Sequence, residues 1–361
     1  MDPLSHVKDL IPYVPGKPVE ELEREYGIKG SIKIASNENP LGPSKLALKA
    51  VESALSNVHR YPDGDSFYLK EKLASFLDVK PENLIIGNGS NEVIEMVART
   101  YLSPVDEAIY GEHAFIVYPI VTQSIGARHV VSPMPDLVHD LKDIESRISD
   151  KTRIIFIANP NNPTGTIVNR NDFELFLKAV PENVLIIADE AYFEYVNDED
   201  YPNTLEYHNQ YPNLITVRTF SKVYGLAGLR IGYGVASEEI TSYVNRVRAP
   251  FNVNSLAQEA AIGALDDHEH VNSSNELNRT GMKFLEQNFN DLDINFTKSY
   301  TNFILIDLKK DPMPVYNSLL NEGVIVRPVG GYGLKKHLRV TVGTEEENNR
   351  FITALKKVLH K

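Results

Sequence analysis

Residues 154–165 read IIFIANPNNPTG, residues 184–193 read VLIIADEAYF, and residues 214–222 read LITVRTFSK. Each stretch begins with a short run of Ile, Val, Leu or Phe, and each run passes directly into polar sequence. Apolar runs of this length are typical of strands that are buried on both faces of a parallel sheet. Leu84–Ile86, which is followed by Gly87-Asn88-Gly89-Ser90-Asn91, repeats the pattern.

Helical stretches separate these runs, for example Asn91–Tyr101 and Arg170–Val180. Alternation of strands and helices predicts an α/β fold with a doubly wound, mostly parallel sheet. We expect this large domain to span residues 44–249, after a proline-rich N-terminal arm at 1–43. A smaller α+β domain is expected at 250–361. It is predicted to contain helices at Ser255–Asp266, Asn275–Asn288 and near Val315–Asn321, and strands at Phe303–Leu308, Val324–Arg327 and Leu338–Val342.

Composition excludes several classes of protein. The 361 residues include no Cys, which removes disulfides, thiolate nucleophiles and Cys-ligated zinc or iron–sulfur sites. A net charge of −12 opposes nonspecific binding to nucleic acid or acidic membranes. No apolar run approaches the roughly 20 residues of a membrane helix, and Met1–Leu10 lacks the features of a secretory signal. We therefore expect a cytoplasmic enzyme without a metal.

The polar residues that follow the strands are the candidates for chemistry, because ligands bind at the carboxyl ends of parallel strands. Lys222 follows an apolar strand, and Arg230 lies eight positions later. A partly desolvated lysine near a second cation has the lowered pKa that a Schiff-base nucleophile needs. Asp189 is either a turn cap or a buried carboxylate that requires a cationic partner.

Two other segments keep alternative interpretations open. The loop Gly87–Asn91 is either an ordinary helix cap or an anion site at a helix N-terminus, and it matches neither a P-loop nor a dinucleotide fingerprint. His268-Glu269-His270 has the composition of a metal site, but it follows Asp266-Asp267 in a polar stretch. We interpret it as a solvated loop.

The ordered combination of these motifs resembles a known family. Asn162-Pro163-Thr164-Gly165, Asp189-Glu190-Ala191-Tyr192, Ser221-Lys222 and Gly225–Arg230 are similar to the fold-type I, pyridoxal-phosphate-dependent aminotransferases of class I/II. Further segments most resemble the branch of that family that acts on histidinol phosphate; these are Pro12-Tyr13, Asn37–Pro43, Arg60–Asp63, Val326-Arg327 and Leu338–Thr344. Relatives that act on aromatic amino acids share much of this pattern.

The resemblance implies a role for each matching residue. Lys222, Asp189 and Tyr192 would be catalytic: Lys222 binds the cofactor as a Schiff base and moves the proton, and Asp189 pairs with the pyridinium nitrogen. The other implied cofactor contacts are Tyr192 and Asn162 at the ring oxygen, Phe115 on the ring face, and Ser90, Asn91, Ser221, Arg230 and the partner subunit's Tyr61 at the phosphate. A shared phosphate site implies an obligate homodimer. The implied substrate contacts are Tyr13, Asn39, Arg327 and Arg339.

The resemblance implies a ping-pong transamination between histidinol phosphate and 2-oxoglutarate, giving imidazole-acetol phosphate and glutamate. Two planar guanidinium groups, Arg327 and Arg339, suit a pocket that must hold a phosphate and a carboxylate in turn. Two rival functions stay open: an aromatic amino-acid or dual-specificity aminotransferase, and a threonine-phosphate decarboxylase. A third alternative, from another class of protein, is a non-catalytic sensor of pyridoxal phosphate. We expect no sensor, because the chain starts almost directly at the arm and its net charge opposes a DNA-binding module.

Overall fold

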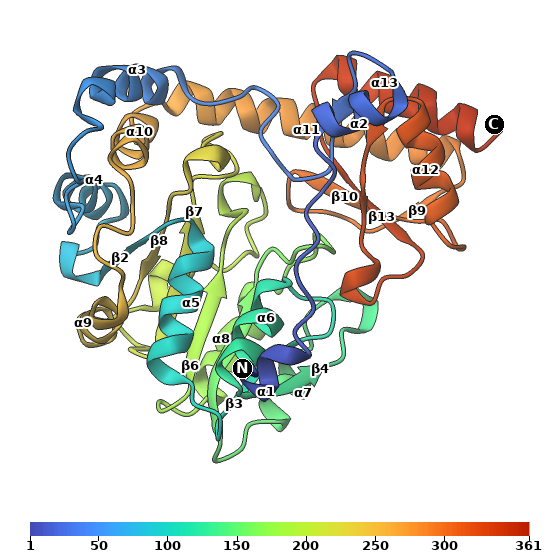
Figure 1. Ribbon diagram of the computed structural model, residues 1–361. Helices are drawn as coiled ribbons and strands as arrows, with labels where there is room; N and C mark the ends of the chain where they lie inside the picture. The colour runs from blue at the N-terminus through green and yellow to red at the C-terminus, as the bar shows by residue number, and fades with distance from the viewer. Residues whose placement is uncertain (361) are drawn as a thin grey trace.

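The computed structural model describes residues 1–360 and centres on a seven-stranded sheet (Figure 1). Its strands are β2 (Leu84–Gly87), β3 (Glu107–Gly111), β4 (Arg128–Ser132), β5 (Thr152–Ala158), β6 (Leu185–Asp189), β7 (Leu214–Thr219) and β8 (Gly232–Val235). The strand order is β2-β8-β7-β6-β5-β3-β4, and β8 alone runs antiparallel to its neighbours. The sheet confirms the predicted doubly wound α/β class and the four strand positions on which it rested.

Helices cover both faces of this sheet because its strands are apolar on both sides. The helices α5 (Ser90–Tyr101), α6 (Val117–Ile125), α7 (Leu141–Ser146) and α8 (Arg170–Ala179) lie between its strands in the chain, and α9 (Glu238–Val247) follows β8. On β5, Phe156 points to the face that α5, α6 and α9 cover, whereas Ile155 and Ile157 point to the face that α7 and α8 cover. Burying one such side chain contributes roughly 1.5–3 kcal/mol, so the sheet forms a rigid base for the loops at its carboxyl edge.

A second, smaller packing unit follows. Its sheet has the order β12-β13-β10-β9. The elements are β9 (Asn295–Phe296), β10 (Phe303–Asp307), β12 (Arg327–Pro328), β13 (His337–Thr341), α11 (His268–Asp291), α12 (Met313–Asn321) and α13 (Glu345–Val358). Leu285 and Phe289 of α11 pack with Phe351 of α13 in its core.

The packing departs from the predicted boundary near Pro250. Helix α10 (Ser255–Leu265) packs against α3 (Lys45–Ala54) and α4 (Phe67–Leu77), in one apolar cluster with β2 and β8 of the large sheet. Small apolar residues of α10, among them Ala257 and Ala261, allow this close approach. The packing therefore supports a boundary near the start of α11, later in the chain than predicted.

The N-terminal segment is more ordered than an irregular arm. Helix α1 (Ser5–Lys8) lies beside α6, and the chain then crosses to α2 (Val19–Tyr26) on the small unit (Figure 1). Strand β1 (Ile32–Lys33) pairs with β11 (Val324–Ile325), and Leu22 of α2 is buried against Leu320 and Ile325. Residues 19–34 thus belong to the small packing unit.

The prediction of a solvated loop at His268–His270 is wrong. These residues form the first turn of α11, and Asp267 caps that helix by accepting the backbone N–H of His270 at 3.1 Å. Acidic side chains at a helix start are favourable, which explains why a polar run became helix.

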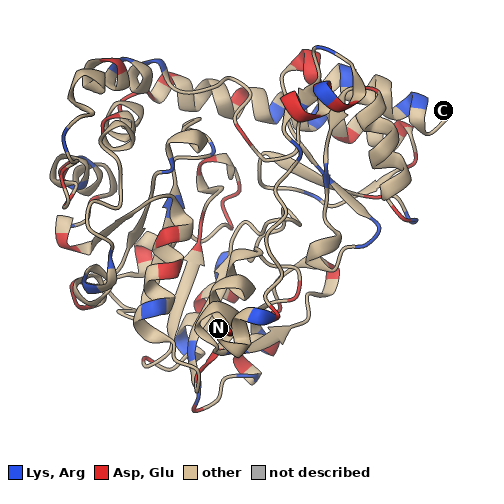
Figure 2. Cartoon of the chain, in the orientation of Figure 1, with Lys and Arg blue, Asp and Glu red and all other residues tan. Residues whose placement is uncertain are grey.

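Charged side chains of both signs are interspersed over the outer helices, as Figure 2 shows. Among residues 1–360, no helix combines the length and the apolar character that crossing a membrane requires.

Candidate active site

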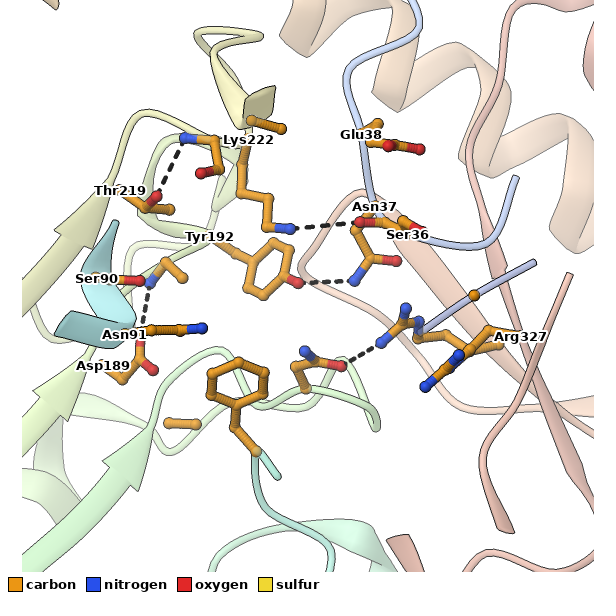
Figure 3. A pocket seen from close by; sticks show the side chains of 18 of the residues that line it. Ser36, Asn37, Glu38, Ser90, Asn91, Asp189, Tyr192, Thr219, Lys222 and Arg327 are labelled. Atoms are coloured by element: carbon orange, nitrogen blue, oxygen red, sulfur yellow. Dashed lines mark hydrogen bonds between the residues drawn. The ribbon is translucent and has the colours of Figure 1, made fainter. Parts of the chain in front are cut away.

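A cavity of about 260 Å³ lies at the carboxyl ends of β5, β6 and β7, where the two packing units meet (Figure 3). Twelve of the fourteen predicted site residues line it: Tyr13, Ser90, Asn91, Phe115, Asn162, Asp189, Tyr192, Ser221, Lys222, Arg230, Arg327 and Arg339. The two exceptions are Asn39 and Tyr61. The convergence follows from the topology, because parallel strands present the loops after their carboxyl ends at one edge.

Lys222 follows β7 and extends into the cavity. Its Nζ donates to the backbone oxygen of Ser36 at 3.5 Å and lies 5.5 Å from the centre of the Tyr192 ring. Burial lowers the pKa of Lys222 to about 8, and the nearby Arg339 and Arg230 guanidinium groups act in the same direction. A substantial neutral fraction of this amine near pH 8 makes Lys222 a nucleophile and a base.

Asp189 ends β6 at the floor of the cavity. Its Oδ2 accepts from the hydroxyl of Tyr118 at 2.8 Å, and its Oδ1 accepts from the N–H of Ala191 at 3.2 Å. Burial raises the pKa of Asp189 to about 6, whereas these two hydrogen bonds oppose the rise. The carboxylate is therefore ionised at neutral pH and suited to pair with a cation from the cavity.

Tyr118, which contacts Asp189, is a residue of this site that was not predicted from the sequence. It is fully buried, and its ring stacks on Phe156 with centroids 4.7 Å apart. It comes three residues after Phe115, a spacing that puts both residues on one side of a helical turn. This three-residue spacing is the feature of the sequence that indicates Tyr118 as a neighbour of Phe115.

Arg339 and Asn162 are joined at the opposite side of the cavity. Nη1 of Arg339 donates to Oδ1 of Asn162 at 2.6 Å, and Nη2 donates to the backbone oxygen of Ala35 at 2.7 Å. Because Oδ1 is engaged, the amide N–H groups of Asn162 are the part that can contact a bound molecule.

The loop between β2 and α5 forms a cradle against Arg230. A Cβ on Gly89, which has φ +82°, would lie 2.5 Å from Nη2 of Arg230, so only glycine fits there. Nη1 of Arg230 lies 3.5 Å from Oγ of Ser221, and Ser90 and Asn91 begin α5. One guanidinium, two hydroxyls and helix N–H groups make this cradle fit a phosphate dianion.

Arg327 begins β12 at the mouth of the cavity. Its Nη2 donates to the backbone oxygen of Val14 at 2.7 Å, and its Cζ lies 5.4 Å from the centre of the Tyr13 ring. Arg327 is half-buried and lines the same cavity as Arg339, so a second anion-binding group faces the space above Lys222.

Asn39, predicted to contact substrate, does not line the cavity. Its Nδ2 donates to the backbone oxygen of Val223 at 2.7 Å and to Oγ of Ser274 at 2.8 Å. Asn39 therefore supports the segment after Lys222 from outside. The neighbouring Asn37 faces the site instead, with Nδ2 donating to the Tyr192 hydroxyl at 2.7 Å.

Tyr61 does not reach the cavity of its own chain. Its side chain is 82% exposed and stacks on Phe251 with centroids 4.7 Å apart. This position is compatible with a residue that serves a partner subunit.

Comparisons with known proteins agree with this geometry. The family model described as aminotransferase class I and II matches residues 29–355. The chain is 50% identical to histidinol-phosphate aminotransferase 1 of Nitrosococcus oceani over 353 residues (98% of this chain, 95% of the relative). It is 51% identical to histidinol-phosphate aminotransferase 2 of Pseudomonas aeruginosa over 355 residues (98% and 96%).

Solved structures agree as well. The crystal structure of histidinol-phosphate aminotransferase from Sinorhizobium meliloti in complex with pyridoxal-5′-phosphate superimposes with a TM-score of 0.92 at 27% identity, covering 99% of this chain and 97% of that one. Aspartate aminotransferase from Thermus thermophilus, at 21% identity and a TM-score of 0.85, shares the fold over 99% of this chain and 100% of that one. The chain thus belongs to the class I and II aminotransferases, a family of pyridoxal-phosphate-dependent enzymes.

Proposed function

We propose that this aminotransferase transfers the amino group of histidinol phosphate to 2-oxoglutarate, giving imidazole-acetol phosphate and glutamate. The observation that carries the proposal is the joint placement of Lys222, Asp189 and two substrate-side guanidinium groups, Arg327 and Arg339, in one cavity. The relatives named for this activity, at about half identity over nearly the whole chain, support it.

The residues of the cavity fit pyridoxal phosphate. Ser90, Asn91, Ser221 and Arg230 would hold its phosphate, Phe115 would pack on its ring, and Asn162 and Tyr192 would donate to its ring oxygen. Asp189 would keep a proton on its ring nitrogen. When bound, this cofactor supplies an aldehyde that combines with amines and a ring that accepts the electrons released at Cα.

Lys222 supplies the acid–base step. Burial lowers the pKa of Lys222 to about 8. Its Nζ can therefore take the proton from the substrate Cα and donate a proton to the C4′ carbon of the cofactor. Arg339 lies close enough to favour the neutral amine electrostatically, so the anion-binding side of the cavity also tunes the base.

In a ping-pong reaction, the same part of the cavity must bind two different anionic substrates in turn. Arg339, which is already oriented by Asn162 and Ala35, suits the carboxylate of glutamate. Arg327 at the mouth suits the phosphate ester of histidinol phosphate, and the exposed ring of Tyr13 lies beside it.

A single half-reaction tests the substrate. Protein loaded with pyridoxal phosphate is mixed separately with histidinol phosphate, phenylalanine and threonine phosphate, and conversion of the cofactor is followed by absorbance. We expect fast conversion to pyridoxamine phosphate by histidinol phosphate alone. Comparable conversion by phenylalanine would indicate an aromatic or dual-specificity enzyme, and failure with all three would overturn the substrate assignment.

Arg327→Ala tests the phosphate contact. Loss of a charge-assisted hydrogen bond costs about 1.5–3 kcal/mol, so kcat/KM for histidinol phosphate should fall about 10- to 150-fold, with a much smaller loss for phenylalanine. Arg279→Ala, on the exposed face of α11 where Arg279 pairs with Glu276, is the control. Equal losses for the two substrates would remove Arg327 from phosphate recognition.

The proposal includes a homodimer in which Tyr61 contacts the cofactor phosphate of the partner subunit. Phe251 stacks on the exposed ring of Tyr61, and the exposed apolar side chains Val58, Phe67 and Tyr68 lie within seven positions of Tyr61 in the sequence. Large exposed aromatic groups on one surface indicate a protein interface, and a second copy of this chain is the occupant that would complete the phosphate site. A cytoplasmic location stays a prediction from the sequence.

A further inference from the structure

A chain of hydrogen bonds connects Tyr192 to the small packing unit through Asn37. Nδ2 of Asn37 donates to the Tyr192 hydroxyl at 2.7 Å, and Oδ1 of Asn37 accepts from Oγ1 of Thr341 at 3.1 Å. The same Thr341 oxygen accepts the backbone N–H of Asn37 at 3.0 Å. Nδ2 of Asn302 donates to the backbone oxygen of Asn37 at 3.0 Å. All four residues are nearly inaccessible to solvent.

These contacts determine which end of the Asn37 amide faces Tyr192. The Thr341 oxygen accepts the backbone N–H of Asn37, and its one hydroxyl proton is donated to Oδ1 of the same residue. Oδ1 therefore faces Thr341, and Nδ2 faces Tyr192. Asn37 also holds a left-handed backbone conformation, with φ 57°, which its contacts with Thr341 and Asn302 maintain.

The direction of these bonds decides where the Tyr192 proton points. The phenol oxygen accepts from Asn37, and among residues 1–360 no protein acceptor takes its proton. Burial raises the pKa of Tyr192 well above its ordinary value, so the group remains a neutral phenol with one proton to donate. The phenol lines the cavity, as Figure 3 shows.

We propose that Asn37, oriented by Thr341, is a positioning residue that makes Tyr192 a hydrogen-bond donor toward the ring oxygen of the cofactor. The inference rests on the proposed function, because it assumes that pyridoxal phosphate occupies this cavity. Thr341 belongs to β13, and Asn302 directly precedes β10. The small packing unit therefore determines the direction of the hydrogen bond that Tyr192, a residue of the large unit, makes with the cofactor.

Binding to the apoprotein tests this without turnover. The two ligands are pyridoxal phosphate and 3-deoxypyridoxal phosphate, which lacks the ring oxygen, and the measurement is the ratio of their Kd values by fluorescence. Asn37→Asp replaces the donor with an acceptor that turns the Tyr192 proton away from the cavity. We expect the wild-type preference for pyridoxal phosphate to fall about tenfold in Asn37→Asp. Thr341→Val should lower it less, and Thr341→Ser should restore it.

Two further variants separate positioning from general damage. Asn213→Asp places a carboxylate at another buried asparagine, whose Nδ2 donates to the backbone oxygen of Val184 at 2.7 Å, and it should keep the wild-type ratio. In a Tyr192→Phe background, Asn37→Asp should have no further effect on the ratio, because the donor is already absent.

The outcomes distinguish the two proposals. If the wild-type apoprotein binds neither ligand, the cofactor assignment fails. If pyridoxal phosphate binds normally and the ratio in Asn37→Asp stays within twofold of the wild-type ratio, or if Asn37→Asp still lowers the ratio after Tyr192→Phe, the role of Asn37 is overturned.

Discussion

Lys222 and Asp189 face the same cavity, and burial shifts their pKa values in opposite directions. The amine of Lys222 becomes easier to deprotonate, with a pKa of about 8, and the carboxyl of Asp189 becomes harder to deprotonate, with a pKa of about 6. Between these values the carboxylate is mostly charged, and the amine exchanges protons readily. A base and an ion-pairing group can thus work together near neutral pH.

Tyr118→Phe should raise the pKa of Asp189, because the donor to Oδ2 is lost while the burial is unchanged. A protonated Asp189 pairs poorly with the ring nitrogen, so the pH below which pyridoxal phosphate binding weakens should shift upward by about one unit. The measurement is the cofactor Kd from pH 5 to 8. Tyr110→Phe, which removes a hydroxyl bonded to His129 on the same sheet, is the control and should leave the profile in place.

The burial of Asp189 also predicts a pH dependence of stability in the apoprotein. Its pKa is higher in the folded than in the unfolded chain, so folding favours the protonated form. The resulting stabilisation is present below about pH 4 and is lost as the pH rises through about 6. Relative to Asp189→Asn, the wild type should lose about 2 kcal/mol of unfolding free energy between pH 4 and pH 7. A difference that is flat with pH in denaturant titrations would contradict this.

At the scale of single elements, the segment at the start of α5 leaves no space for a side chain at Gly89. Gly89→Ala would place a Cβ 2.5 Å from Arg230 at a φ of +82°, so Arg230 must move away from the phosphate cradle. We expect cofactor affinity to fall at least tenfold, measured as the Kd of the apoprotein. Gly228→Ala, where nothing lies within 4 Å of the added Cβ, should bind normally; equal losses in the two variants would argue against the cradle.

The strands that carry the site could be predicted because runs such as Ile154–Ala158 are apolar on both faces, and the residues after them then had to meet at one edge. The sequence could not distinguish Asn37 from Asn39. The two lie two positions apart, and only contacts with the distant Thr341 and Ser274 turn one toward the cavity and the other away. For the same reason the packing of α10 could not be predicted, because its partners come from α3 and α4.

At the scale of the whole molecule, the exposed Tyr61 predicts complementation between inactive subunits. Lys222→Ala should lose covalent attachment of the cofactor, and Tyr61→Ala should bind pyridoxal phosphate about tenfold more weakly or worse. In a hybrid dimer, the cavity that keeps Lys222 receives an intact Tyr61 from its partner. Mixed and re-associated subunits should therefore regain activity and tight cofactor binding. Activity equal to the sum of the two separate variants would argue against a shared site.

The position of Tyr61 also has a thermodynamic consequence. If one subunit completes the phosphate site of the other, pyridoxal phosphate and the partner chain are heterotropic ligands of the same protomer, and each strengthens the binding of the other by the same factor. A tenfold coupling corresponds to about 1.4 kcal/mol. Dilution should then release the cofactor, and a shortage of cofactor should release monomers, so the assembled fraction of the enzyme would follow the supply of pyridoxal phosphate.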